Sequence, residues 1–308
     1  MTGLDAVGIG TPTLDELLLL PSYPDEQVES AIRMAGYAVD GGGPAATAMV
    51  AAARLGWRTG YVANVGDDER GRRILEGLRA AGVDASTVVV QPGGRSTLSV
   101  VCIHAPTGRR SFLLDSDPEL RLSPRELPRD YIASARILLV ESFAPTALAA
   151  AALARKAGRK VVVDASAMPA EQSRVSGLFS LTDVVIASAR FAREFLGRDD
   201  PSAAAEAIRA AGAPVAVVTA GADGAFLSAA GEAFHQPAFA VEVVDTTGAG
   251  DVFHGAFIAA MLEGLPPRTA TAWAAGAAAL SCRRLGGRAG IPDRRELVEF
   301  LRRHGQAA

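Results

Sequence analysis

The sequence predicts an α/β protein in which a parallel sheet carries helices on both faces. Two observations favour this class. Short apolar runs alternate with alanine-rich segments of helical length over most of the chain, and the runs are nearly continuous and rich in β-branched residues. Such runs are typical of strands that are buried on both faces. Strands that alternate with helices favour parallel pairing, because each helical crossover returns the chain to the same edge of the sheet.

The elements of this core follow one another in a regular order. The predicted strands are "DAVGIG" (5–10), "ARILLV" (135–140), "RKVVVDAS" (159–166), "DVVIAS" (183–188) and "APVAVVTAG" (213–221). Helices are predicted between them, for example over 145–157 and 202–211.

Two segments interrupt this order. Residues 13–40 contain "LDELLLLPSYP" and "GYAVD", and residues 95–115 contain two strand-like runs joined by the turn "APTG". Alternating apolar residues on either side of a glycine turn are typical of a hairpin. We expect both segments to form a small antiparallel sheet set off from the main one. No internal repeat or long linker divides residues 1–308, so a single domain is predicted.

Composition narrows the classes of function. The 308 residues carry a net charge of −3 with acidic and basic residues interspersed, which argues against nucleic acid or an anionic membrane as a partner. The N-terminal stretch has an early acidic residue and only a four-leucine run, so it predicts neither a secretory signal nor a membrane span. A cytoplasmic enzyme or binding protein is expected.

The glycine-rich stretches differ in what they predict. "GIGTPT" (8–13) lacks the third glycine of a dinucleotide fingerprint, and no lysine follows any glycine loop as a Walker-type phosphate loop requires. "DGGGPAATAMVAAARLG" (40–56) is a glycine turn that leads into a helix of small residues. Tight helix packing and a ligand site are about equally good interpretations of that pattern.

The stretch "AVEVVDTTGAGD" (240–251) carries the most chemical information. It predicts a strand, "AVEVV", followed by Gly248, Ala249 and Gly250 in the first turn of a helix. Small residues there leave backbone N–H groups open to an anion. Asp251 alone would be interpreted as a helix-capping residue. An anion cradle beside a carboxylate, however, is the arrangement that phosphoryl transfer to a hydroxyl requires.

These residues resemble a known family. "DTTGAGD" resembles the signature of the ribokinase-type (PfkB) carbohydrate kinases, and residues 40–56 resemble the N-terminal signature of the same family. "VGDDERGRRILEGLRAAGVD" (65–84), "VVTAGADGAF" (217–226) and "GGRAGIPD" (286–293) match further segments in the family order. In the sequence of these motifs, the chain is most similar to the sulfofructose kinase branch.

The resemblance implies a ribokinase-like three-layer α/β/α core with a small β-sheet lid. It also implies ATP as phosphoryl donor, Mg²⁺, and a homodimer formed through the lids. Asp251 would be the catalytic base, with Gly248, Ala249 and Gly250 as the anion hole. The residues implied for the sugar are Asp15, Gly42, Gly43, Thr47 and Glu141, and those implied for the nucleotide are Ser188, Thr219, Gly221 and Gly224.

Three departures and alternatives accompany this assignment. Many members carry an asparagine where Thr47 stands, so one sugar contact is altered, and Glu141 could equally be a surface glutamate. Ser188 and Phe191 replace the asparagine and glutamate of a family motif near the metal, which leaves Mg²⁺ to the phosphates and water. His254 could share the helix face of Asp251 or simply be a packed histidine.

A monovalent cation and the sugar itself complete the predictions. Asp245 and Thr247 resemble the start of a K⁺ loop, with "GGRAG" as its other wall. A neutral pentose or ketohexose is favoured, because the strand end at Glu141 lacks an arginine and the lid segments contain only four. These are Arg33, Arg95, Arg109 and Arg110. The alternatives are a sulfofructose or sugar-phosphate kinase, a nucleoside kinase, and a non-catalytic sugar-binding regulator, against which an intact Asp251 argues.

Overall fold

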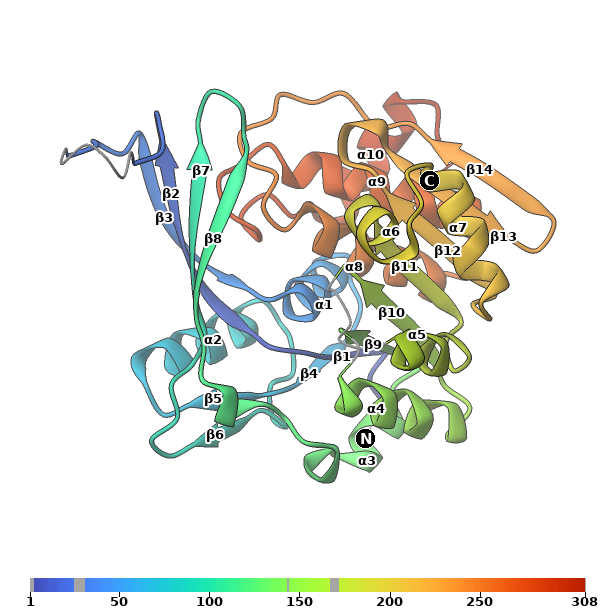
Figure 1. The fold of residues 1–308 in the computed structure, drawn as a ribbon, viewed down its shortest axis with the longest axis horizontal. Coiled ribbons are helices and arrows are strands. Elements are labelled where there is room, and N and C mark those ends of the chain that lie inside the picture. Colours follow the sequence, from blue (N-terminus) through green and yellow to red (C-terminus); the bar gives the residue numbers. More distant parts are fainter. Residues whose placement is uncertain (1–2, 25–30, 143, 167–171, 308) are drawn as a thin grey trace.

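The computed structural model describes residues 3–24, 31–142, 144–166 and 172–307, and its largest feature is an eight-stranded sheet (Figure 1). The strand order is β14-β13-β12-β11-β10-β9-β1-β4, parallel from β12 to β4 and antiparallel at β13 and β14. Its strands are β1 (Ala6–Ile9), β4 (Thr59–Val62), β9 (Ile137–Glu141), β10 (Lys160–Ala165), β11 (Val184–Ser188), β12 (Val215–Thr219), β13 (Ala225–Ala229) and β14 (Glu232–Gln236). The five core strands predicted from sequence are confirmed.

Both faces of this sheet are buried. Successive residues of β10 alternate between two core clusters, with Val161 and Val163 in one and Val162 in the other, and all three are fully buried. A period of two places alternate side chains on opposite faces. Both faces must therefore be apolar, which is why these strands are nearly continuous hydrophobic runs.

Helices cover the two faces in two separate groups (Figure 1). One group comprises α1 (Pro44–Arg54), α8 (Ala249–Leu262) and α9 (Pro267–Ser281), with α10 (Arg294–Arg303) packed on α9. The other comprises α3 (Arg129–Ser134), α4 (Pro145–Lys156), α5 (Gln172–Phe179), α6 (Ala189–Leu196) and α7 (Pro201–Ala210). Within the described ranges, no helix combines the length and apolar character needed to cross a membrane.

A second sheet of four strands stands beside the core (Figure 1). Its order is β3-β2-β7-β8, formed by β2 (Thr13–Leu20), β3 (Gly36–Gly42), β7 (Leu98–His104) and β8 (Arg110–Asp115), and α2 (Glu69–Ala80) packs against β2 and β3. The predicted hairpin across "APTG" is confirmed as β7 and β8. Residues 25–30 of the predicted lid segment lie outside the described residues. A short sheet of β5 (Asn64–Gly66) and β6 (Val89–Gln91) completes the strands.

Two details of the prediction are wrong. The lid sheet is not fully antiparallel, since β2 pairs with β7 in parallel: both strands leave the core in the same direction. The segment "AVEVV" is not a strand. It follows edge strand β14, and the N–H groups of Val244 and Asp245 instead donate to the carbonyl of Cys282 at the end of α9. The β-branched residues of this segment favour a strand, but they do not determine which part of the chain it hydrogen-bonds to.

Helices α1 and α8 approach each other closely at Gly255. A Cβ atom at this position would lie 2.2 Å from the carbonyl oxygen of Ala48 and 2.7 Å from the Cβ of Ala51. Both neighbours belong to α1, and a backbone atom cannot move aside as a flexible side chain can. Gly255 is therefore a contact residue between the two helices that begin at the candidate site.

We expect Gly255→Ala to destabilise the fold by about 1–3 kcal/mol, the usual cost of overpacking a core. Unfolding midpoints in urea, with the slope checked for constancy, measure this loss. Gly77→Ala is the matched control, because the space around Gly77 in α2 is open and alanine is the better helix former. Equal stability of the two variants would contradict the close approach of α1 and α8.

Candidate active site

The carboxyl ends of the parallel strands bring most of the predicted residues to one edge. Glu141 at the end of β9 lies opposite Asp164 of β10 in the sheet register, and Ser188 at the end of β11 lies opposite Thr219 of β12. From β1 the chain continues to β4 on one side and to β9 on the other, so the connections reverse between β1 and β9. Ligands of open α/β sheets bind at such a point.

Glu141 joins three segments at this reversal. Its carboxylate accepts hydrogen bonds from the N–H of Thr11 at 2.6 Å, after β1, and from the N–H of Ala45 at 2.8 Å, in the first turn of α1. A Cβ atom at Gly10 would lie 2.1 Å from this carboxyl group, so only glycine leaves room for it. The next residue, Ser142, has a φ of 69°, a strained conformation for a non-glycine residue. Glu141 is thus not an ordinary surface glutamate.

Helix α8 begins with an open first turn. Gly248 is its N-cap with a φ of 71°, and no side chain caps the helix. A Cβ atom at Gly248 would lie 2.8 Å from the Cα of Gly287, so position and conformation both require glycine. Ala249 and Gly250 add little or no side-chain bulk. The N–H of Ala249 donates to the carbonyl of Thr246 at 3.3 Å. The first turn of a helix carries further N–H groups without an intrahelical acceptor, which an anion can bind.

Asp251 stands in that first turn and is partly accessible. Its pKa is raised to about 7, chiefly by burial and also by the carboxylates of Asp164, Glu141 and Asp15, against the effect of His254, which lowers it. Burial likewise raises the pKa of Glu141 to about 7, against the effect of its two backbone hydrogen bonds. A carboxyl group with a pKa near neutrality can exchange a proton with a hydroxyl at physiological pH.

Asp15 extends the site into the lid sheet. It lies on β2, is 7% exposed, and accepts a hydrogen bond of 2.5 Å from the hydroxyl of Thr13. A Cβ atom at Gly42 would lie 2.3 Å from the carboxylate oxygens of Asp15, so the backbone of Gly42 passes directly beneath them. Gly43 follows with a φ of 89° as the N-cap of α1. The structure therefore brings Asp15, Gly42 and Gly43 together, as predicted.

Arg288 is the residue that the sequence reasoning missed. It is 9% exposed, and its Nη2 donates to the carbonyl of Gly42 at 2.7 Å while its Nε donates to the hydroxyl of Thr47 at 3.2 Å. Its own N–H donates to Asp40 at 2.9 Å. Burial lowers the pKa of Arg288, and the nearby carboxylates, Asp40 foremost and then Asp15, raise it. The guanidinium of Arg288 thus lies against residues that are predicted to bind the sugar.

This arginine bears on two predictions. Thr47 is 1% exposed and its hydroxyl accepts a hydrogen bond from Arg288, and its contact with a sugar stays a prediction. The premise behind a neutral sugar, that no arginine lies near these carboxylates, is wrong. That premise rested on the lid segments and one strand end, whereas Arg288 belongs to the loop after α9, 246 residues from Gly42 in sequence. The stretch "GGRAG", already matched to the family, was the available signal.

The four residues predicted for the nucleotide surround the ends of β11 and β12. Ser188 caps α6 by accepting a hydrogen bond from the N–H of Phe191, and the hydroxyl of Thr219 donates to the carbonyl of Ala187. Gly221 and Gly224 have φ values of 59° and 90° in the turn that leads to β13. The structure brings these four residues together on the same edge of the sheet as the residues predicted to bind the sugar.

The predicted cation loop and its second wall are in contact. Asp245 is buried, accepts hydrogen bonds from the N–H and hydroxyl of Thr247, and accepts a third from the N–H of Gly286. The aspartate therefore ties the α8 loop to the loop that carries Arg288. Among the described residues, no cluster of three or more His, Cys, Asp or Glu side chains could hold a metal ion.

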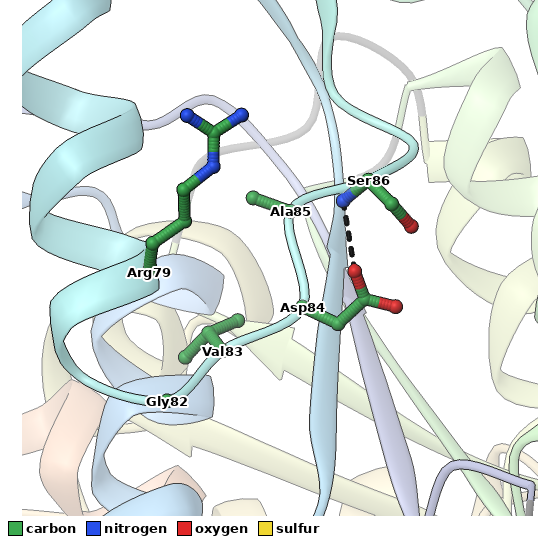
Figure 2. Close-up of a pocket in the computed structure, with 6 residues that line it drawn as sticks. All are labelled: Arg79, Gly82, Val83, Asp84, Ala85 and Ser86. Carbon is green, nitrogen blue, oxygen red and sulfur yellow. Dashed lines mark hydrogen bonds between the residues drawn. The ribbon is translucent and has the colours of Figure 1, made fainter.

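A surface hollow lies apart from these residues (Figure 2). It is lined by Arg79 of α2 and by residues 82–86 of the following turn, where Asp84 accepts a hydrogen bond of 2.9 Å from the N–H of Ser86. None of the predicted site residues contributes to its lining. We therefore place the candidate site at the strand ends, where the chemically competent residues lie, and not at this hollow.

Comparison with known families agrees with this geometry. The family model described as "pfkB family carbohydrate kinase" matches residues 12–294. The chain belongs to this family. It is therefore a carbohydrate kinase, a phosphotransferase with an alcohol group as acceptor.

Individual PfkB proteins are similar over almost their whole length. A ribokinase of Haemophilus influenzae is 30% identical, with 95% of this chain and 97% of that protein covered. The crystal structure of a putative ribokinase from Agrobacterium tumefaciens superposes with a TM-score of 0.90 at 31% identity, covering 99% of this chain and 100% of that one. Ribokinase of Arabidopsis thaliana, solved with ribose and ATP, gives a TM-score of 0.79 at 25% identity over 97% and 99%. The predicted ribokinase-like fold is confirmed, and the sulfofructose branch stays a prediction.

We expect Asp251→Asn to raise the unfolding temperature at pH 8.5. The pKa of Asp251 is about 7 in the folded protein against an ordinary 3.8, so ionising it costs folded-state stability as pH rises between these values. The asparagine variant avoids this cost, and its advantage should shrink as pH falls below about 7. Thermal unfolding from pH 5 to 8.5 measures the difference, with exposed Asp199→Asn as control. A pH-independent difference would contradict the assigned shift.

Proposed function

We propose that this PfkB kinase transfers the γ-phosphoryl group of ATP to a sugar hydroxyl, with Asp251 as general base. The observation that carries the proposal is the carboxyl group of Asp251, with a pKa of about 7, in the open first turn of α8. The base can take the proton of the hydroxyl while the N–H groups of Gly248, Ala249 and Gly250 stabilise the phosphoryl oxygens. Both functions come from one helix end, so their relative position is rigid.

The remaining predicted residues divide between the two substrates. Asp15 on the lid side and Glu141 on the strand side would accept hydrogen bonds from sugar hydroxyls, over the backbone of Gly42 and Gly43. Ser188, Thr219, Gly221 and Gly224 would line the nucleotide. The arrangement of strands supports this division, because the sugar candidates lie on β2 and at the ends of β3 and β9, whereas the nucleotide candidates lie at the ends of β11 and β12 and in the turn after β12.

ATP and Mg²⁺ are the cofactors of this proposal. The described residues offer no carboxylate cluster for the metal, so Mg²⁺ would bind through the phosphates and water and neutralise charge on the transferring group. K⁺ is a further proposal. Asp245 and Thr247 hold the α8 loop against residues 286–288, and backbone carbonyls there would supply the oxygen ligands that a hard cation prefers.

A homodimer through the lids is supported by the exposed surface of β8. Phe112, Leu113 and Leu114 are 52%, 62% and 67% exposed, although they are large and apolar. Strand β8 pairs only with β7 in the described sheet, so its other edge is open. An open edge that presents apolar residues on both faces favours association with a second strand. A second copy of the same lid is the partner we propose.

The proposed activity predicts ADP release with a sugar as second substrate. The panel should contain ribose, fructose, 2-keto-3-deoxygluconate, fructose 6-phosphate, sulfofructose and a nucleoside, because Arg288 removes the reason for restricting it to neutral sugars. We expect sugar-dependent ADP formation whose kcat/KM rises with pH through about 7, where Asp251 ionises. Asp251→Asn should lower turnover by at least about 10²-fold with ATP binding retained.

Two controls make this test decisive. Asp199→Asn, on the surface, should match the wild type, and calorimetry should give similar ATP affinities for all variants. Near-normal turnover in Asp251→Asn would remove the residue from its role. ATP binding without sugar-dependent ADP release across the panel would instead favour the non-catalytic regulator.

A second variant tests whether Arg288, through Gly42 and Thr47, supports the proposed sugar site. Arg288→Gln should lower kcat/KM for the sugar by about tenfold or more, the factor expected when a hydrogen bond to a charged group is lost, and leave KM for ATP unchanged. Arg288→Lys should not restore activity, because an ammonium cannot reach Gly42 and Thr47 in the same planar geometry. Arg284→Gln in the same loop, where the arginine is exposed, is the control. An equal effect on ATP would contradict a role at the sugar.

A further inference from the structure

His254 lies one helical turn after Asp251, between α8 and the main sheet. It is 4% exposed. Its Nδ1 lies 2.7 Å from the carbonyl oxygen of Gly250, and its Nε2 lies 3.4 Å from the carbonyl oxygen of Ile186 and 3.6 Å from a carboxylate oxygen of Asp164. The imidazole therefore connects the start of α8 to strands β10 and β11.

Every one of these neighbours is a hydrogen-bond acceptor. A neutral imidazole carries one N–H and one lone pair, so in either tautomer the lone pair would point at an oxygen. A ring with a proton on both nitrogens avoids this repulsion and donates in both directions. The positive charge then lies beside the carboxylate of Asp164, which is 2% exposed. Buried charges are tolerated when they are paired in this way.

We propose that Asp164 and His254 form a buried ion pair that acts as a positioning device beneath the base, balancing its charge and orienting the first peptide units of α8. This inference rests on the proposed role of Asp251. Neither residue contacts the reacting atoms in this assignment. In this pair, Nδ1 of His254 donates to the carbonyl of Gly250, whose peptide unit includes the N–H of Asp251. The carboxylate of Asp164 attracts the other side of the ring.

The charges around Asp251 show what the pair contributes. Asp164 on β10, Glu141 on β9 and Asp15 on β2 raise the pKa of Asp251, whereas His254 on α8 itself lowers it. Arg288 also interacts with this carboxyl group from the loop after α9. Because Asp164 and His254 act on the pKa of Asp251 with opposite signs, the effect of one partly offsets the effect of the other. Removal of the imidazolium alone leaves an uncompensated carboxylate beneath the base.

The pH dependence of kcat/KM in three variants tests this balance. His254→Asn should move the acid limb upward by about one pH unit, the shift expected from an unopposed neighbouring carboxylate. Asp164→Asn should leave the limb at no higher pH than in the wild type. The double variant His254→Asn with Asp164→Asn should bring the limb back toward the wild-type position. His304→Asn, at the exposed C-terminal end of α10, is the matched control.

The two possible roles give different results. If His254 only fills space, its loss lowers activity at every pH and the second substitution does not correct it, which would overturn the proposal. Recovery in the double variant would support a charge pair. If no sugar in the panel is phosphorylated, the proposed function fails, and the pair is judged by spectroscopy instead.

Nitrogen NMR of the free wild-type protein gives that independent readout. With ¹⁵N-labelled histidine, the four imidazoles give few signals, and the His254→Asn spectrum identifies the one that disappears. We expect both ring nitrogens of His254 to show the shifts of protonated nitrogen at neutral pH. One protonated and one unprotonated nitrogen would overturn the proposal whatever the activity measurements show.

Discussion

The two hydrogen bonds of Glu141 are the interaction on which the site depends. A single carboxylate holds the end of β1, the first turn of α1 and the end of β9 in one place, at the point where the strand connections reverse. Gly10 is required to make room for it. Helix α1 in turn packs on α8 through Gly255, so the position of Asp251 follows from the same junction. The position of the candidate base relative to the sheet edge thereby depends on this one carboxylate and on the close contact of α8 with the backbone of α1.

This arrangement concentrates negative charge. The carboxylates of Asp164, Glu141 and Asp15 act on Asp251, and Asp164 also acts on Glu141, so burial and this repulsion raise the pKa of Asp251 and of Glu141 to about 7. Such crowding costs folded-state stability, and enzymes accept this cost where catalysis needs a poised carboxyl group. Two cationic groups oppose the repulsion, Arg288 on the lid side and, in our proposal, His254 beneath α8.

The lid is bound to the core at the same corner. Arg288 connects the loop after α9 to Gly42 at the end of β3, and the carboxylate of Asp40 accepts a hydrogen bond from the backbone N–H of that arginine. Beyond this corner the lid presents the exposed apolar side chains of β8. In our proposal this sheet covers the sugar, and its open edge at β8 meets a second copy.

The sequence by itself determined the α/β class, the five core strands, the hairpin of the lid and the open start of α8, because each depends on local periodicity or on a local glycine requirement. Family signatures added Asp15, Glu141 and Asp251. Only the tertiary structure decided that β2 runs parallel to β7, that "AVEVV" bonds to the end of α9 instead of a sheet, and that Arg288 reaches Thr47. Contacts across about 240 residues depend on how packed elements meet, and no local pattern in either segment records its partner. The pairing of Asp164 with His254 is of the same kind, since two strands and a helix must be in place before three acceptors surround one imidazole.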